Sequence, residues 1–270
     1  MYPIQPYFAL SSNRYYKRPI EAAGIAHIYE YSSEHTDNDS VVVIPDGCID
    51  LMIDENHPED VSYAAGSVLK GTHIALKEGH RYFGVRFMPG HIPSFIDGSM
   101  PDFIGNTIDL SLCTNVSEPL IGGILDHSSF QDKADFFLRF YGDTEKESAI
   151  SNPQTELASY IRDMIEKSHG LIKVKEIAEE TGYTERYINK VFKTVTGMAP
   201  KFYCRIMRFQ QTIDHLDHDT SIAMTALAID HGYYDQSQFN REFREFTLLT
   251  PSLYRKTILQ SRYAEKFILS

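Results

Sequence analysis

Two stretches of this chain share one pattern: IAEETGY at residues 177–183 and LAIDHGY at residues 227–233. Each has an aliphatic residue and an alanine, then three mostly polar residues, then Gly-Tyr. The correspondence continues downstream, with Phe192 matching Phe243, Lys193 matching Arg244, and Pro200 matching Pro251. The second copy is one residue longer, and the extra residue falls at Tyr234. A unit of structure is therefore present twice.

Each copy has the features of a helix-turn-helix. An alanine allows a second helix to cross closely, and a glycine four residues later permits the positive φ of a sharp turn. A good N-cap residue then precedes the second helix. In the two copies these positions are Ala178 and Ala228, Gly182 and Gly232, and Thr184 and Asp235. We predict units at about 174–196 and 221–247, joined by a long helix at about 200–217.

The second helix of each unit is expected to bury one face and expose the other. The predicted buried residues are Ile188, Val191, Phe192 and Val195 in the first copy, and Phe239, Phe243 and Phe246 in the second. The outward residues are mostly Arg, Lys, Asn and Gln, which pair with base edges and phosphates. Glu185 and Glu242 are the exceptions, and Arg205 and Arg208 are expected to add positive charge nearby. The alternative is a polar face that is merely solvated.

Residues from about 157 to 257 resemble the DNA-binding region of AraC/XylS-type transcriptional regulators. The match is carried by Ile177-Ala178, Gly182-Tyr183, Phe192-Lys193, Gly197, Pro200, Arg208, Ile222, Leu227-Ala228, Gly232-Tyr233, Phe239, Arg241, Phe243, Pro251, Tyr254 and Arg255. The resemblance implies that each second helix enters the major groove, in successive turns of one duplex. It assigns base contacts to Arg186, Asn189 and Lys190 in one groove and to Gln236, Ser237, Gln238 and Arg241 in the next. It assigns phosphate contacts to Lys193 and Arg244.

Two positions depart from this family. Leu248 stands where a glycine often follows the second recognition helix, whereas the first unit keeps Gly197. Because leucine is strained in a left-handed cap, the second unit is expected to end differently. Thr212 replaces a small alanine in the linker helix, and we expect it to bend or loosen that helix.

Charge divides the chain into two parts. The formal net charge is −11, but residues 151–270 hold 16 Lys and Arg against 15 Asp and Glu, so residues 1–150 carry −12. A nearly neutral second half is still compatible with a basic face. No apolar run approaches the roughly 18 residues of a membrane span. Three distant cysteines and the lack of a secretory leader predict a cytoplasmic protein with reduced thiols.

Residues 1–150 are predicted to be mainly β, followed by one or two helices, with the domain boundary near residue 150. SVVVIPDGCIDLMID (40–54) gives two β-rich runs around a turn, and HRYFGVRFMPG (80–90) alternates cleanly. IPDGCIDLMI (44–53) and GVRFMPG (84–90) resemble the cupin-like sensor domain of one branch of these regulators. The predicted fold is therefore a cupin-like barrel with helices at 1–150 and an all-α DNA-binding domain at 151–270.

Arg86 is the main candidate for an effector contact, together with Tyr82 and His80 on the same strand face. A buried guanidinium needs an acidic partner, and Asp46 and Asp50 are plausible ones. An internal ion pair that locks two strands is therefore the competing interpretation of Arg86, and simple exposure is a third. No tight group of histidines and carboxylates predicts a metal, and no cofactor is expected.

The sequence favours a transcriptional regulator that binds double-stranded DNA and responds to a small-molecule effector, with an activator expected and a repressor left open. The resemblance implies RNA polymerase as a partner and a homodimer, with the helix around Ala134–Tyr141 as the predicted dimer surface or an internal packing face. No membrane partner is expected. The chain has no Ser/His/Asp pattern, phosphate loop or carboxylate dyad, so we expect no enzyme activity. The alternatives are a cupin-like enzyme and a protein-binding adaptor with a degenerate helix-turn-helix tail.

Overall fold

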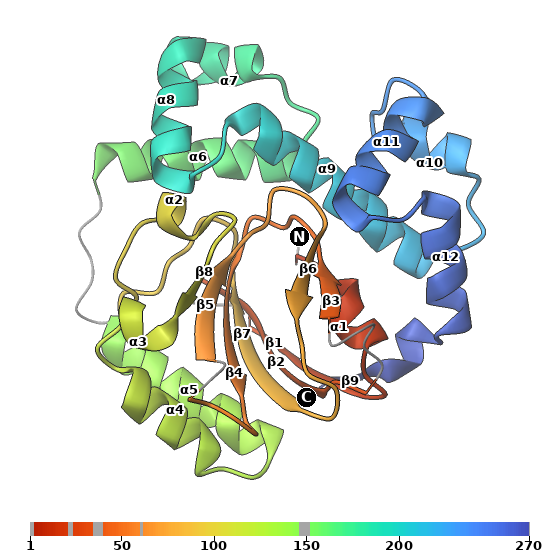
Figure 1. The fold of residues 1–270 in the computed structure, drawn as a ribbon. Coiled ribbons are helices and arrows are strands. Elements are labelled where there is room, and N and C mark those ends of the chain that lie inside the picture. The colour runs from red at the N-terminus through yellow and green to blue at the C-terminus, as the bar shows by residue number, and fades with distance from the viewer. Residues whose placement is uncertain (1–2, 21–23, 35–39, 60–61, 146–151, 270) are drawn as a thin grey trace.

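The computed structural model describes residues 3–20, 24–34, 40–59, 62–145 and 152–269. Sheets occupy the first half of the chain and helices the second, so the predicted fold class is confirmed (Figure 1). The predicted boundary near residue 150 lies outside the described residues. The terms first half and second half denote residues 1–150 and 151–270 below.

The first half is built on a curved seven-stranded sheet in the order β8-β5-β4-β7-β2-β1-β9. A second sheet contains β3 and β6 and lies across from its concave side (Figure 1). The strands are β1 Tyr15–Pro19, β2 Ile25–Ser32, β3 Ser40–Val43, β4 Ile49–Asp54, β5 Ser62–Gly66, β6 Thr72–Ala75, β7 Arg81–Phe87, β8 Thr107–Asp109 and β9 Phe267–Leu269. The two β-rich runs on either side of the predicted turn, β3 and β4, therefore belong to different sheets.

The alternation of β7 separates two apolar layers, as its sequence predicts. Phe83, Val85 and Phe87 pack with helices on the outer face of the large sheet, whereas Tyr82 lies between the two sheets. The outer helices and the short helices around them are α2 Met100–Phe103, α3 Leu110–Cys113, α4 Ser117–Leu125 and α5 Phe130–Glu145, whereas α1 Pro6–Leu10 packs against β3 in the cluster between the sheets. Both faces of β7 are buried, and alternate side chains enter the two layers.

Helix α5 is an internal packing element. Ala134, Phe137 and Tyr141 are buried against the large sheet and α4. The prediction that this helix forms a dimer surface is therefore wrong, because its apolar side chains are already covered within the chain. The alternative, an internal packing face, is the observed one.

The second half consists of helices only, up to the short segment that returns to the sheet. They are α6 Pro153–Lys167, α7 Val174–Thr181, α8 Glu185–Thr196, α9 Pro200–His218, α10 Met224–Asp230, α11 Gln236–Thr247 and α12 Pro251–Gln260. We call α7 with α8 the first unit and α10 with α11 the second unit. Helix α9 joins them without interruption, although the Thr212 hydroxyl donates to the Arg208 carbonyl at 2.9 Å. The segment Tyr263–Lys266 is a 3-10 helix that leads into β9.

The turns of the two units match closely. Gly182 and Gly232 have φ values of 71° and 70°, as a sharp left-handed turn requires. After the second helices, Gly197 has φ 74° and Leu248 has φ 62°. The expectation that the second unit ends differently is therefore wrong. Leu248 adopts the strained conformation, at a cost of about 1–2 kcal/mol relative to glycine.

The two units contact the first half in different ways. In the second unit, Phe243 and Phe246 share one apolar cluster with Tyr7, Phe8 and residues between the two sheets. The Tyr7 hydroxyl also donates to the Thr247 carbonyl at 2.8 Å, and the Gly71 amide donates to the Glu245 carbonyl at 2.9 Å. In the first unit, the apolar residues form a separate cluster with α6 and α9.

Candidate nucleic-acid interface

The first recognition helix, α8, begins at Thr184, whose side chain accepts a hydrogen bond from the Tyr187 amide at 3.3 Å. Ile188, Val191 and Phe192 are buried, as predicted. The predicted DNA-contacting residues Arg186, Lys190 and Lys193 are exposed. None of these three cations forms an ion pair with a residue that the structure describes.

Asn189 differs from its three neighbours. It is half-buried, and its side-chain amide donates to the Glu185 carbonyl of the same helix at 2.8 Å. The residue therefore lies at the edge of the exposed face, and its amide group is bound to its own backbone. This bond uses one N–H of the amide, and the second N–H and Oδ1 remain available for a base.

The second recognition helix, α11, begins at Asp235, whose carboxylate accepts from the Gln238 amide at 2.7 Å. Phe239, Phe243 and Phe246 are fully buried, as predicted. The exposed predicted residues are Gln236, Ser237, Arg241 and Arg244. Gln238 is half-buried, and its Oε1 accepts from the Tyr234 amide at 2.9 Å, so it stabilises the longer turn of this copy.

Three charged residues were misplaced by the sequence interpretation. Glu242 is buried and faces α9, where its carboxylate lies 2.7 Å from Arg205 Nε and 3.4 Å from Arg208 Nη2. Arg205 also pairs with Glu245. The acidic side chain is therefore removed from the outer face. Arg205 and Arg208 on α9 are paired with carboxylates of α11 and do not add positive charge near the recognition helices.

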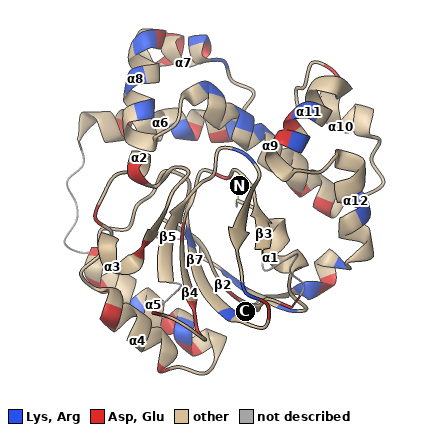
Figure 2. Cartoon of the chain, in the orientation of Figure 1, with Lys and Arg blue, Asp and Glu red and all other residues tan. Residues whose placement is uncertain are grey.

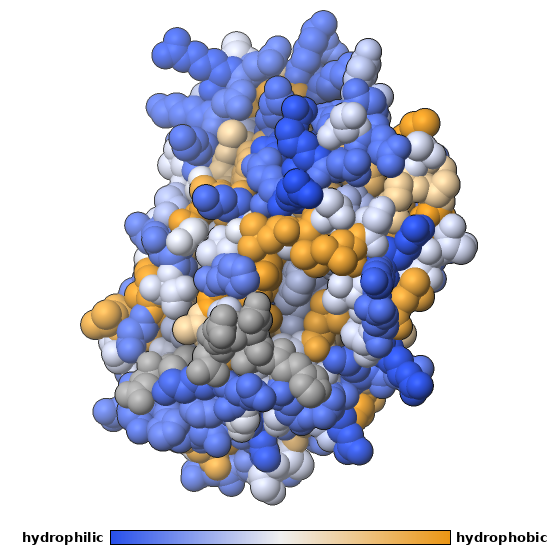
Figure 3. Space-filling view, turned by 45° about the vertical axis from the view of Figure 1, so that its right-hand side comes forward, coloured by the Kyte–Doolittle hydropathy of each residue, from blue (hydrophilic) through white to orange (hydrophobic). Residues whose placement is uncertain are grey.

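Figures 2 and 3 show the resulting surface. Basic residues occur on α8 and α11 (Figure 2), and the upper end of the molecule is mainly hydrophilic, with apolar residues gathered across the middle (Figure 3). Both units lie on the same side of α9, above the sheets (Figure 1).

Aromatic residues at these helix starts were not predicted as contacts. Tyr183 and Tyr187 are exposed, with ring centroids 5.0 Å apart, and Tyr234 is 92% exposed in the turn before α11. The one-residue difference between the copies marked Tyr234 as unusual. Tyr187 lies next to buried Ile188, so the helical period could have placed it outward.

The effector candidates Arg86, Tyr82 and His80 share a strand face but do not form one site. Arg86 is 1% exposed, and its Nε donates to Asp50 Oδ1 at 2.9 Å. Asp50 and Arg86 are register partners on β4 and β7, so the predicted ion pair between two strands is present. Desolvation opposes the charge on Arg86, yet Asp50 and Asp46 hold its pKa well above the ordinary value.

The other two candidates have separate partners. His80 Nδ1 lies 2.6 Å from Asp54 Oδ2, and the Tyr82 hydroxyl accepts from the Lys77 amide at 2.9 Å. Of the three candidates, Arg86 alone lines the cavity described below. The sequence grouped the three candidates because alternation along a strand predicts that they share a face. Whether they share a cavity also depends on which elements cover that face.

The described part of the chain contains possible metal ligands and three cysteines, all three of which are buried. No group of three or more His, Cys, Asp or Glu residues there is arranged to hold a metal ion. The cysteines Cys48, Cys113 and Cys204 are buried free thiols, and burial raises the pKa of each. Among the described helices, none has the length and apolarity needed to cross a membrane.

Two family models match separate parts of the chain. A helix-turn-helix domain matches residues 177–257, which span both units, and a domain of unknown function (DUF6597) matches residues 22–109. The regulatory protein SoxS of Escherichia coli is 30% identical over 100 residues, which cover 37% of this chain and 90% of SoxS. The chain belongs to the AraC/XylS family of transcriptional regulators.

Other relatives of this AraC/XylS-family regulator match similar regions. The transposon Tn10 TetD protein of Escherichia coli is 26% identical over 136 residues, covering 50% of this chain and 94% of TetD. Among solved structures, ToxT from Vibrio cholerae is 15% identical and covers 85% of this chain and 97% of ToxT, with a TM-score of 0.43. A probable AraC family regulator from Rhodopseudomonas palustris is 24% identical over 39% of this chain and 97% of its own, with a TM-score of 0.35.

Proposed function

We propose that this regulator reads double-stranded DNA with α8 and α11, each placed in the major groove of successive turns of one duplex. The observation that carries the proposal is the repeated exposed face, on which Arg186, Lys190, Arg241 and Arg244 have no ion-pair partner among the described residues. Cations without internal partners are available for phosphates and base edges. The inward pairing of Glu242 removes the carboxylate that would oppose this role in the second unit.

The residues divide into two proposed roles. Arg186, Asn189 and Lys190 face bases in one groove, and Gln236, Ser237, Gln238 and Arg241 face bases in the next. Lys193 and Arg244, nearer the helix ends, bind phosphates. Arginine pairs in a bidentate manner with guanine, whereas a phosphate contact carries no sequence information.

The test uses a duplex selected from a random library by the full chain, with binding measured by fluorescence anisotropy at several salt concentrations. Arg186→Ala and Arg241→Ala should each weaken binding by about 1–3 kcal/mol and relax sequence preference in one half of the site only. Lys193→Ala and Arg244→Ala should weaken binding to all sequences and reduce the salt slope by about one unit.

Lys77→Ala is the matched control, because Lys77 is an exposed lysine in the first half. It should leave the affinity and the salt slope unchanged. Altered specificity in Lys193→Ala with no effect of Arg241→Ala would show that the helices face the duplex differently. Binding that is absent or independent of salt would favour a protein-binding adaptor or an enzyme.

We further propose that the protein activates transcription with RNA polymerase, as a homodimer, in response to a small effector bound by the first half. The support is the family membership and the similarity to AarP of Providencia stuartii, which is described as a transcriptional activator and is 27% identical over 84 residues. In vitro transcription from a promoter that carries the selected site tests activation, and sedimentation equilibrium tests the dimer. Transcription that falls when the protein is added would contradict activation.

A further inference from the structure

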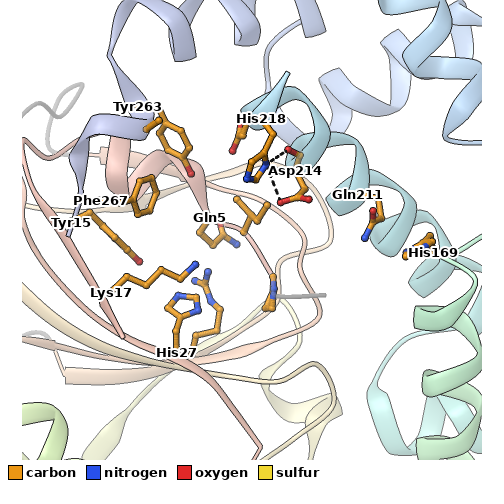
Figure 4. Close-up of a pocket in the computed structure, with 15 residues that line it drawn as sticks. Gln5, Tyr15, Lys17, His27, His169, Gln211, Asp214, His218, Tyr263 and Phe267 are labelled. Carbon is orange, nitrogen blue, oxygen red and sulfur yellow. Dashed lines mark hydrogen bonds and ion pairs between the residues drawn. The ribbon is translucent and has the colours of Figure 1, made fainter. Parts of the chain in front are cut away.

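A cavity of about 580 Å³ lies between the large sheet and helix α9 (Figure 4). Lys17 on β1, His27 on β2 and Arg86 on β7 line its sheet side. Asp214 and Asp217 on α9 line the opposite side. Because α9 joins the two helix-turn-helix units, whatever occupies this cavity touches both the sheet and the helix that positions the DNA-reading units.

The sheet side presents polar nitrogen atoms that lack partners. The Lys17 side chain points into the cavity (Figure 4), and it forms no hydrogen bond or ion pair with any described residue. His27 is 2% exposed and also points inward, and its Nδ1 has no hydrogen-bond partner in the part of the chain that the structure describes. Buried polar groups are normally paired, so an unpaired buried imidazole beside an unpaired, half-buried ammonium group indicates a missing acceptor. Burial lowers the pKa of His27 well below its ordinary value, so the ring is neutral. A carboxylate suits the Lys17 ammonium group together with the imidazole tautomer that carries its proton on Nδ1.

Arg86 strengthens the positive character of this side. The Arg86 guanidinium is already paired with Asp50 and Asp46. Its effect on the cavity is therefore electrostatic. Burial and then repulsion from Arg86 lower the pKa of Lys17 to about 8. Lys17 still carries its charge in most molecules near pH 7. A bound anion is the partner that would relieve this repulsion.

The α9 side is acidic. Asp214 is half-buried, and its side-chain Oδ1 lies 3.6 Å from His218 Nδ1. Asp217 accepts a hydrogen bond from the Tyr254 hydroxyl at 2.9 Å. Asp214 favours the charged form of Lys17 across the cavity, although no ion pair links the two residues. The cavity therefore separates a positive side from a negative side, with room between them.

We propose that this cavity binds a small zwitterion of the amino-acid class, with its carboxylate at Lys17 and His27 Nδ1 and its ammonium group toward Asp214. This inference rests on the proposed effector response and names the class of the effector. A simple carboxylic acid leaves the acidic side unmatched, and a simple amine leaves the two nitrogen donors unmatched. The zwitterion bridges the sheet and α9, so its binding is coupled to the placement of both reading units.

The test measures binding to the full chain without DNA, by thermal denaturation and by isothermal titration calorimetry. The probes are the common α-amino acids, their betaines and dipeptides, each beside the matched acid that lacks the amine and the matched amine that lacks the carboxylate. At least one zwitterion should raise the denaturation midpoint. Both of its matched analogues should bind at least about tenfold more weakly, as expected when a charged hydrogen bond is lost.

Three variants locate the binding. Lys17→Met should weaken zwitterion binding by about tenfold or more, and Asp214→Asn should do the same while leaving binding of the matched acid unchanged. Lys256→Met, at an exposed lysine of α12, is the control and should change nothing. Because Asp214 is half-buried, Asp214→Asn is expected to fold, and it tests the proposal even if Lys17→Met folds poorly.

Two results would overturn the proposal. One is an acid without an amine that binds as tightly as any zwitterion and is insensitive to Asp214→Asn, which would indicate a plain anion site. The other is a panel in which no compound shifts the midpoint. Neither result concerns DNA, so failure of this inference is distinguishable from failure of DNA binding, which the anisotropy titration measures separately.

Discussion

The two helix-turn-helix units have the same local geometry and different surroundings. Gly182 and Gly232 make equivalent turns, and Gly197 and Leu248 end the recognition helices in the same left-handed conformation. Phe192 of the first unit packs with residues of α6, α7 and α9, whereas Phe243 of the second unit shares a cluster with the sheets. A motif encoded by a short pattern thus folds identically in two places, while its neighbours are set by the rest of the chain.

This difference has a consequence for regulation. The first unit touches the first half at one end of α8, where Gly197 approaches Pro101 and Ile104. The second unit shares an apolar cluster with residues of both sheets through Phe246, and its Thr247 carbonyl accepts from Tyr7 of α1. A change in the first half therefore reaches both units directly, the first through α2 and the second through Tyr7 and Gly71, and α9 links the two units.

The largest predicted effect compares two buried phenylalanines. Phe192→Ala and Phe243→Ala should each lower the free energy of unfolding by about 3–5 kcal/mol, because both rings are fully buried. Hydrogen exchange should separate them. Phe243→Ala should reduce amide protection in β3 and β6 of the first half, and Phe192→Ala should not. Equal loss of protection in these strands would contradict the difference between the units.

The second prediction concerns a buried carboxylate beside the second unit. Burial raises the pKa of Asp217 to about 7, above its unfolded value of 3.8. The stabilising contribution of the neutral form is therefore present below the unfolded pKa and is lost as the pH rises toward 7. Asp217→Asn stays neutral. The difference in free energy of unfolding, variant minus wild type, should therefore increase by on the order of 2 kcal/mol between about pH 5 and about pH 8.

Chemical denaturation across this pH range measures the effect. Asp230→Asn, at an exposed carboxyl of α10, is the control. A difference between Asp217→Asn and wild type that stays constant with pH would show that Asp217 is not the responsible group.

The third prediction concerns the residues that end the two recognition helices, Gly197 and Leu248. A side chain at Gly197 is strained at φ 74°, and its Cβ would lie 2.7 Å from Ile104 Cγ1. Gly197→Ala should therefore destabilise the protein by about 2 kcal/mol, and Leu248→Gly should stabilise it by about 1 kcal/mol. Thermal denaturation of the two variants measures both effects. Destabilisation by Leu248→Gly would mean that packing of the leucine outweighs its backbone strain.

The smallest predicted effect tests the helix caps. Thr184→Ala and Asp235→Ala should each cost about 1 kcal/mol, because each removes one acceptor from the first turn of a recognition helix. Similar losses would show that the caps act locally in both units. A much larger loss of unfolding free energy for Asp235→Ala would show that the turns of the two units also differ.

Features with a local physical cause could be predicted from the sequence. The turn glycines, the caps, the buried sides of α8 and α11, and the alternation of β7 follow from backbone sterics and from the periods of helix and strand. The Arg86–Asp50 pair also followed, because a guanidinium in an apolar strand needs a carboxylate. Glu242 was misplaced because it lies next to the buried Phe243, where the helical period does not distinguish outward from inward. Its direction is set by Arg205 and Arg208 on α9.

The sequence by itself determined the repeated helical units, their exposed basic and amide side chains and the β-rich character of the first half, since each depends on contacts between near neighbours. The tertiary structure decided which apolar faces meet, so α5 is covered by the large sheet and the second unit closes the space between the sheets. It also placed Lys17 and His27 opposite Asp214. Residues so far apart in the chain share a cavity only because burial of apolar surface folds the two halves together.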